Sequence, residues 1–220
     1  MRLSWRAMSV VVVCVCVLAG CSGWSDQPSG QGTHTPSNSG SPARIAGSLP
    51  ELFQKALDTL PATQAEREVI QRAIVTGRID SADYEAFHLG YVQCLEQHGF
   101  DPPFRKTPEG YYIELPFAPG DPDASTNAHD ECIKQMAVID VLYRAQQGNP
   151  ELLADSRLQA VRCLQKYGYL GSDYTAEDFD RDKSADTFPF DKYEEQPNNC
   201  LYLAGYAYWR VGPMPSDAPR

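Results

Sequence analysis

The chain has 220 residues, of which 42% are hydrophobic, and a formal net charge of −10. Its 29 acidic residues outnumber the 19 basic ones, which argues against nucleic-acid binding, because that depends on Lys and Arg neutralising phosphates. The same acidity argues against a chain that lies flat on an anionic lipid surface. The length allows one folded domain of ordinary size.

The N-terminal residues have the pattern of a secretory signal peptide. Arg2 and Arg6 form a positive flank, residues 7–18 are almost wholly apolar, and small residues follow. The apolar run is shorter than the roughly 20 residues that cross a bilayer. A cleaved signal is therefore favoured over a retained transmembrane helix.

The apolar run ends in Leu18-Ala19-Gly20-Cys21, which resembles the lipobox of bacterial lipoproteins at all four positions. The resemblance implies that residues 1–20 are a lipoprotein signal peptide and that the Cys21 thiol receives a diacylglyceryl group, with acyl chains such as palmitate. It thus implies anchoring to the cell membrane at its extracytoplasmic face. Ordinary secretion, with Cys21 in a disulfide, is the alternative. Removing Arg2 and Arg6 leaves 17 basic and 29 acidic residues, a net charge of −12.

The rest of the chain divides by composition. Residues 21–47 are rich in Ser, Gly and Pro and predict a lipid-anchored disordered linker, because they bury too little to offset ordering entropy. Residues 48–210 predict a mainly α domain with small extended or β segments. Residues 211–220 predict a flexible tail.

Capping signals predict the first helices. Ser48 precedes a short helix, and Thr63 to Glu66 form a capping box for a helix that Gly77 closes. Asp80 or Ser81 starts a longer helix that ends at Gly99.

The second half of the chain is less regular. Residues 101–110 predict a loop, and residues 111–115 are the best strand candidate. Helices are then expected over about 126–146 and 150–167, with one extra turn after Thr175 and a last helix over about 197–209.

An internal similarity runs through this region. Residues 91–100 (YVQCLEQHGF) match residues 160–169 (AVRCLQKYGY), and Leu115-Pro116-Phe117 corresponds to Phe188-Pro189-Phe190. We interpret these as two tandem helical repeats, about 81–147 and 150–210, although chance similarity is the alternative. The lipobox, the polar linker and the Cys-Leu-x3-Gly elements together resemble small lipoproteins of actinobacteria that have no known activity, so the resemblance supplies no catalytic residues.

Seven cysteines are present, and Cys14 and Cys16 would leave with the signal peptide while Cys21 is lipidated. Four then remain in the exported domain: Cys94, Cys132, Cys163 and Cys200. An even number in an oxidising compartment predicts two disulfides. Pairing within each repeat, Cys94–Cys132 and Cys163–Cys200, is preferred, and pairing across the repeats is the rival.

Two patterns could hold a metal, and each has an alternative. Cys94, His98, His129 and Cys132 have zinc-like spacing, but the second repeat keeps the cysteines without the histidines, which favours disulfides. The string Asp178-x-Asp180-x-Asp182 resembles the start of a calcium loop, but Lys183 stands where Gly is required, so a solvated acidic turn is expected. We expect no metal and no cofactor.

Catalytic motifs are not found in the sequence. His88, His98 and His129 are candidate bases, with His88 expected at the edge of the core, and no pair of carboxylates is singled out. A cell-envelope enzyme, such as a glycan hydrolase with paired carboxylates, and a metal-binding surface protein are the alternatives.

Aromatic residues are the positive feature. Four of them are candidate ligand contacts: Tyr111, Tyr112, Tyr206 and Trp209. Exposed Tyr and Trp suit a glycan or peptide ligand, although core packing is the first explanation for most of them. The sequence therefore predicts a membrane-anchored, non-catalytic binding or interaction domain, with an envelope glycan or protein as partner.

Overall fold

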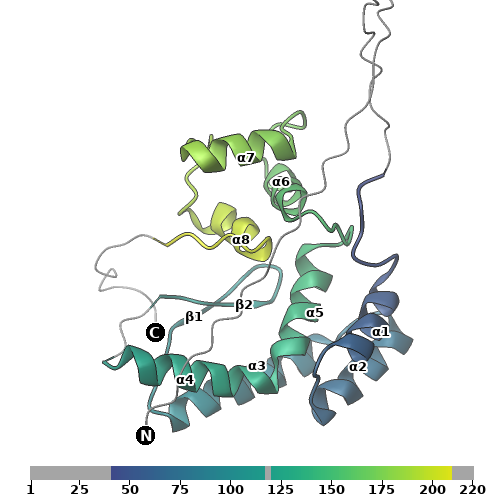
Figure 1. The fold of residues 1–220 in the computed structure, drawn as a ribbon, viewed down its shortest axis with the longest axis vertical. Coiled ribbons are helices and arrows are strands. Elements are labelled where there is room, and N and C mark those ends of the chain that lie inside the picture. Colours follow the sequence, from purple (N-terminus) through teal and green to yellow (C-terminus); the bar gives the residue numbers. More distant parts are fainter. Residues whose placement is uncertain (1–40, 117–119, 210–220) are drawn as a thin grey trace, which may run out of the picture. The chain divides into compact units, whose positions relative to one another are not determined.

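The fold is known from a computed structural model, which describes residues 41–116 and 120–209 (Figure 1). The lipobox with Cys21, most of the predicted linker and the predicted tail lie outside these residues. The described part is mainly helical and contains one small antiparallel hairpin, which confirms the predicted fold class. None of its helices is long and apolar enough for a membrane span.

The described residues form α-helices, two short strands and one 3₁₀ turn. The helices are α1 (Leu49–Thr59), α2 (Gln64–Thr76), α3 (Ser81–Gln97), α4 (Pro122–Cys132), α5 (Ala137–Gly148), α6 (Ser156–Lys166), α7 (Ala176–Ala185) and α8 (Glu195–Leu203). The strands are β1 (Phe104–Lys106) and β2 (Tyr112–Glu114), and the 3₁₀ turn η1 is Ile133–Gln135.

The predicted caps of the first three helices are confirmed. The Ser48 hydroxyl accepts from the backbone N–H of Glu51 at 3.3 Å, and Thr63 and Glu66 form the reciprocal capping box of α2. Gly77 ends α2 with a φ of 81°, a left-handed conformation that favours glycine. Asp80 caps α3 by accepting from Ala82 N–H at 3.1 Å.

The expected loop over residues 101–110 is wrong in part, because β1 lies inside it. β1 pairs with β2 so that Phe104 faces Glu114 and Lys106 faces Tyr112. Pro102 and Pro103 precede the strand rather than interrupt it, and the Pro103 carbonyl accepts from Leu115 N–H at 2.8 Å. Proline at the start of a strand leaves the hydrogen-bond ladder intact.

The single helix expected over residues 126–146 is two helices. α4 starts earlier, at Pro122, because Asp121 caps it by accepting from Asp123 and Ala124 N–H. The chain then passes through η1 and starts again at Ala137. The new N-terminus is capped from another helix, since the Glu66 carboxylate accepts from Val138 N–H at 2.9 Å.

The helix expected from residue 150 starts later, because the preceding residues pair with residues 43–45. Ile45 N–H donates to the Leu152 carbonyl at 2.8 Å and Ala154 N–H to the Ala43 carbonyl at 2.9 Å, so ordered structure begins before residue 47. This pairing keeps residues 150–155 out of helix α6, which starts at Ser156 instead of residue 150.

The last two helices differ from expectation in length. α7 is a full helix rather than one turn, because Thr175 and Asp178 form a reciprocal capping box at its start. α8 begins at Glu195 and ends at Leu203, where a turn through Gly205 at a φ of 84° stops it before the aromatic residues that follow.

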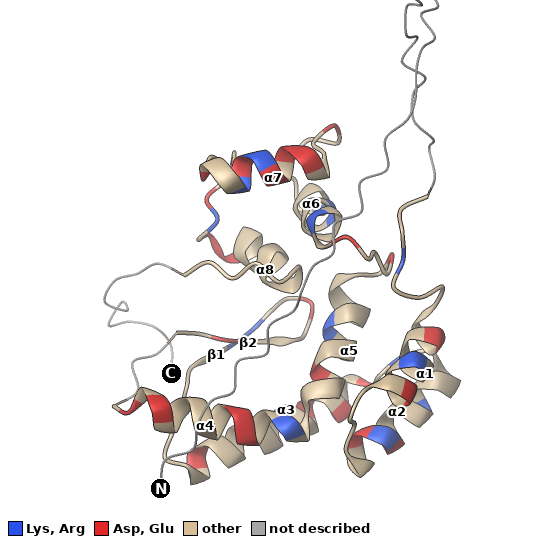
Figure 2. Ribbon diagram, viewed as in Figure 1, with Lys and Arg blue, Asp and Glu red and all other residues tan. Residues whose placement is uncertain are grey.

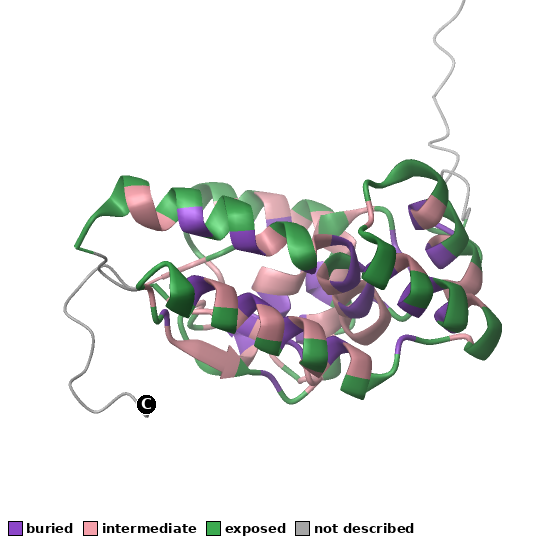
Figure 3. Cartoon of the chain, turned by 90° about the horizontal axis from the view of Figure 1, so that it is seen from below, coloured by how far each residue is buried: buried purple, intermediate pink, exposed green. Residues whose placement is uncertain are grey.

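Buried side chains form two clusters, and Figure 3 shows purple inward faces on helices whose outer faces are green. The first lies among α1 to α5 and the hairpin and includes Ile70, Tyr84 and Ile139. The second lies among α6 to α8 and includes Phe179 and Leu201. Acidic residues are spread over several helices rather than gathered on one (Figure 2).

The disulfides are Cys94–Cys132 and Cys163–Cys200, the pairing preferred from the sequence, and the cross-repeat rival is wrong. Each bond joins the last turn of one helix to a second helix, with Cα–Cα distances of 5.6 and 5.4 Å. The helix ends also match, because Phe100 N–H donates to Leu95 O and Tyr169 N–H donates to Leu164 O. The segments between the cysteines differ, since the first contains a hairpin and the second contains α7.

Candidate functional site

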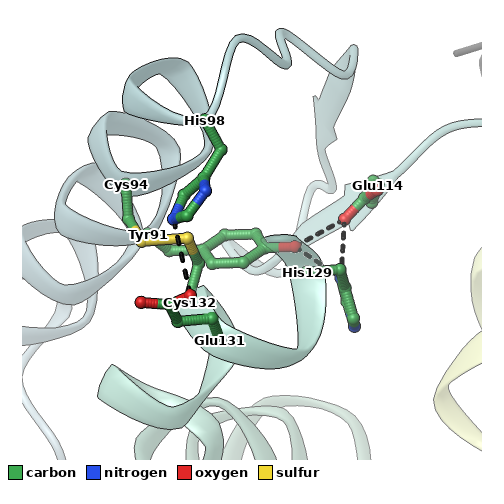
Figure 4. The surroundings of a disulfide bond; sticks show 7 residues. All are labelled: Tyr91, Cys94, His98, Glu114, His129, Glu131 and Cys132. Carbon is green, nitrogen blue, oxygen red and sulfur yellow. Dashed lines mark hydrogen bonds and ion pairs between the residues drawn. A yellow bond between two sulfur atoms is a disulfide. The ribbon is translucent and has the colours of Figure 1, made fainter. Parts of the chain in front are cut away.

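The zinc-like set is only partly brought together (Figure 4). Cys94, His98 and Cys132 have ligand atoms within 4.8 Å of one another, but both sulfurs are bonded to each other in the disulfide. His98 Nε2 lies 3.7 Å from Glu131 Oε2. His129 turns away from the sulfurs toward Tyr91 and Glu114. A metal would need thiolates, so the oxidised protein does not offer this set.

The aspartate string is not a solvated turn, because it lies on helix α7. The Asp178 carboxylate accepts from Thr175 N–H in the capping box and also pairs with Arg181. These contacts lower the pKa of Asp178 to about 2. Asp180 accepts from Arg157 Nη1 at 2.7 Å, and Asp182 accepts from Tyr174 and Arg181. A calcium loop needs several carboxylates turned toward one ion, whereas Asp178 and Asp182 pair with Arg181 and Asp180 pairs with Arg157.

The four predicted ligand contacts do not form one exposed cluster. Tyr111 is fully buried in the first cluster, so its side chain is unavailable to a ligand. Trp209 packs against Tyr202, and Tyr206 packs against Phe179 in the second cluster. Tyr112 is half-buried and is the one of the four that lines the cavity described next.

This cavity, which we call the aromatic cavity, has a volume of about 70 Å³. Aromatic rings and four further polar side chains make up most of its lining. The first group is Tyr84, His88, Tyr91, Phe104, Tyr112 and Tyr202, and the second is Glu114, His129, Asp140 and Arg144. They come from α3, the hairpin, α4, α5 and α8.

Helix α3 supplies the base of the aromatic cavity through its buried face. Tyr84, His88 and Tyr91 follow one another at helical spacing and are all buried. His88 stacks on Tyr112 with ring centroids 3.7 Å apart and an interplanar angle of 8°. Burial lowers the pKa of His88 to about 4, so the ring is neutral near pH 7. Its expected place at the edge of the core is confirmed.

Tyr91 joins two polar groups at the mouth of the aromatic cavity. Its hydroxyl donates to Glu114 Oε2 at 2.8 Å, and its oxygen lies 2.7 Å from His129 Nδ1. Burial, together with the hydrogen bond to Glu114, raises the pKa of the Tyr91 hydroxyl, which keeps its proton. Glu114 and His129 remain part-exposed, with side-chain exposures of 29% and 47%.

An ion pair also lines the aromatic cavity. Arg144 Nε lies 2.9 Å from Asp140 Oδ2, and the guanidinium stands over the Tyr202 ring at 4.9 Å. Burial raises the pKa of the Asp140 carboxyl, and the charge of Arg144 opposes that rise. Tyr84 donates to the same carboxylate at 3.2 Å, so the pair is held in place by an aromatic hydroxyl.

A larger cavity of about 160 Å³ lies where α5 ends beside α6. Its charged groups are engaged with other lining residues: Arg162 lies 3.9 Å from Glu151, and Tyr167 donates to Glu109. The aromatic cavity concentrates more shifted pKa values and more aromatic faces, which are the features of functional sites in proteins. We therefore take the aromatic cavity as the candidate site.

Sequence reasoning missed Glu114, Asp140 and Arg144 as members of one site. Asp140 and Arg144 are four residues apart, which indicates a helix ion pair but not a cavity. Glu114 reaches the site only because of the hairpin, and strand β1 of that hairpin lies within the residues predicted to be a loop. A comparison of the chain with known protein families, with curated proteins and with solved structures found no match.

Proposed function

We propose that the chain is a lipoprotein anchored to the extracytoplasmic face of the cell membrane through a diacylglyceryl group on Cys21. The signal-peptide pattern and the lipobox support this anchor. The two disulfides support it as well, since disulfides persist mainly in oxidising compartments.

Mass spectrometry of the mature protein tests the anchor. We expect an N-terminal peptide that begins at Cys21 and carries the mass of the acyl groups. A Cys21→Ala variant is the control, and it should remain uncleaved at this position and without lipid. An unmodified protein that still begins at Met1 would contradict the anchor.

The domain itself is proposed to be a non-catalytic binding module for a glycan of the cell envelope. One observation carries this proposal: the aromatic cavity combines ring faces with a few converging polar groups, the usual composition of a ligand site. Tyr and His faces suit the apolar faces of sugar rings, and the carboxylates and imidazole suit their hydroxyls.

The size of the cavity limits how much of a ligand it holds. Its volume of about 70 Å³ is far below the roughly 300–1,000 Å³ of sites that enclose a whole small molecule. One sugar substituent would therefore enter, while the rest of the glycan lies across Tyr112, Glu114 and His129 at the mouth.

Binding is tested with the soluble protein starting at residue 41, using β-1,4-linked N-acetylglucosamine oligosaccharides and purified peptidoglycan in sedimentation and titration assays. Tyr112→Ala should reduce affinity by about tenfold or more, as expected for loss of an aromatic contact. Tyr193→Ala is the matched control, because Tyr193 is 40% exposed and does not line the cavity. Equal affinities of the two variants would contradict this site.

A cell-envelope glycan hydrolase is the second candidate, because the carboxylates of Glu114 and Asp140 line the same cavity. Burial raises the pKa of Asp140, which is the direction that a general acid requires. Release of reducing ends from peptidoglycan would favour this candidate. Glu114→Gln should then abolish release while binding persists.

The internal similarity is proposed to be a duplication of one disulfide-linked unit. The matched helix ends and the separations of 38 and 37 residues between bonded cysteines support it. In this proposal only the first copy acquired a hairpin, and with it the aromatic cavity.

A further inference from the structure

Tyr91, Glu114 and His129 lie together at the cavity mouth, and their contacts determine where their protons lie. Tyr91 oxygen has two close polar neighbours, Glu114 Oε2 at 2.8 Å and His129 Nδ1 at 2.7 Å. Each short contact between such atoms needs one hydrogen, and a tyrosine hydroxyl has only one to give. A second proton must therefore come from Glu114 or from His129.

The hydrogen-bonding capacities of the two groups decide which one gives it. An ionised carboxylate has no hydrogen to donate and only accepts hydrogen bonds. A neutral imidazole keeps one proton and can place it on either nitrogen. The lower-energy arrangement is thus Tyr91 donating to Glu114, and His129 Nδ1–H donating to Tyr91.

We infer that Glu114 and Tyr91 hold His129 in its Nδ1–H tautomer, which leaves Nε2 unprotonated as a hydrogen-bond acceptor for the ligand. In this arrangement Tyr91 is a positioning residue, since it acts on the ligand through His129. Figure 4 shows one end of the His129 ring against Tyr91 and Glu114 and the other end directed away from them.

The position of the ring makes Nε2 available. The His129 side chain is 47% exposed, whereas Tyr91, which fixes it, is buried on α3. The ring is therefore anchored at Nδ1 by a buried residue, while about half of the side chain is accessible to solvent. Fixing a histidine through a hydrogen bond on its second nitrogen is a common way to orient the acting nitrogen.

The unprotonated Nε2 of His129 determines which chemical group of a ligand can bind there. Nε2 accepts a hydrogen bond, so the ligand must present an O–H or N–H donor there. A sugar hydroxyl meets this need, and this part of the inference rests on the proposed glycan-binding function. A metal is not favoured, because the described residues that group within metal-binding distance include Cys94, His98 and Cys132 but not His129.

The tautomer can be measured on the free protein, without any ligand. Two-bond ¹H–¹⁵N spectra of the ¹⁵N-labelled protein, recorded where the imidazoles are neutral, distinguish Nδ1–H from Nε2–H rings. His129→Gln assigns the signal by its absence. We expect an Nδ1–H pattern for His129, and an Nε2–H pattern would overturn the inference.

Two phenylalanine variants separate the role of Tyr91 from a general change in packing. Tyr91→Phe removes the hydroxyl but keeps the ring, and His129 should lose its Nδ1–H preference. Tyr84→Phe is the matched control in the same cavity, because its hydroxyl contacts Asp140 and Tyr112 N–H rather than His129. An unchanged His129 tautomer in Tyr91→Phe would overturn the inference.

The ligand part is tested separately with the N-acetylglucosamine oligosaccharides. Tyr91→Phe and His129→Ala should each weaken binding by about tenfold, and the double variant by no more than either alone, because the two residues act as one unit. Wild-type affinity in Tyr91→Phe would overturn Nε2 as the acceptor. If the wild-type protein binds no oligosaccharide, these glycans are excluded as its ligand. The tautomer measurement still tests whether Glu114 and Tyr91 orient His129.

Discussion

The Oε1 atom of Glu66 on α2 accepts a hydrogen bond of 2.9 Å from the backbone N–H of Val138, 72 residues later in the chain. The same oxygen lies 3.3 Å from Ile139 N, and Oε2 accepts from Thr63 N–H at 2.8 Å. One fully buried carboxylate therefore caps two helices, its own and α5.

Glu66→Ala should be among the most destabilising single substitutions in this domain. It leaves the first N–H groups of α5 and Thr63 N–H without a partner, and each buried unsatisfied donor costs about 1–3 kcal/mol. We expect the free energy of unfolding to fall by about 3 kcal/mol in urea titrations with both disulfides intact. Glu68→Ala, two residues later in α2 at an exposed position, is the control and should change this free energy by less than about 0.5 kcal/mol.

The two caps made by Glu66 differ in whether the sequence predicts them. The capping box Thr63 to Glu66 is a local pattern, and it was predicted because all its parts lie within four residues. The second task of Glu66 depends on α5 lying against α2, which no local pattern encodes. The break between α4 and α5 was missed for that reason, since Met136 supplies no side-chain cap of its own.

The disulfides were predictable because the internal similarity of the sequence supplies information beyond a cysteine count. Four cysteines allow three pairings, and the similarity of residues 91–100 to residues 160–169 favoured the one that the structure contains. The aromatic cavity had no such signal. Tyr111 and Tyr112 are adjacent and equally aromatic, and only the pleat of the hairpin puts one in the core and the other at the cavity.

Removal of either disulfide should cost about the same stability. The bonds close loops of 38 and 37 residues, and on the chain-entropy model each contributes about 3–4 kcal/mol. Cys94→Ala/Cys132→Ala and Cys163→Ala/Cys200→Ala are therefore compared by urea unfolding. A loss confined to one pair would show that native-state packing, rather than loop closure, sets the effect.

Two helical glycines should respond to alanine in opposite directions. A Cβ on Gly148, the last residue of α5, would overlap the Leu203 side chain on α8, so Gly148→Ala forces the leucine to move. We expect a loss of about 1–2 kcal/mol. Gly90 in α3 has no atom within 4 Å of its added Cβ, and Gly90→Ala should stabilise the protein by about 0.5–1 kcal/mol.

The opposite signs can be checked by thermal unfolding of the two variants side by side. The double variant Gly148→Ala/Leu203→Ala adds a control, because shortening the leucine removes the overlap. Its loss should be smaller than the sum of the two single losses. Additive losses would show that the end of α5 does not press on Leu203.

His88 should give the stability a dependence on pH in the acidic range. Burial lowers its pKa from 6.5 in the unfolded chain to about 4 in the folded protein. Between these two pH values the unfolded chain binds more protons than the folded protein. The contribution of His88 to the free energy of unfolding is therefore complete above pH 6.5 and is lost as the pH drops toward 4. The contribution of this one residue should be about 2 kcal/mol, below the full linkage value because the ring is not wholly shielded from water.

Carboxylates titrate over part of the same range, so the effect of His88 must be measured as a difference. His88→Phe keeps an aromatic ring against Tyr112, where the native rings lie 3.7 Å apart, and removes the proton-binding group. The difference in unfolding free energy between wild type and His88→Phe should therefore shift by about 2 kcal/mol in favour of the variant between pH 7 and pH 4.5. His98→Gln, at a part-exposed position beside Glu131, should not reproduce this shift. A constant difference between wild type and His88→Phe over the range would mean that the cavity already admits enough water to protonate His88 in the folded state.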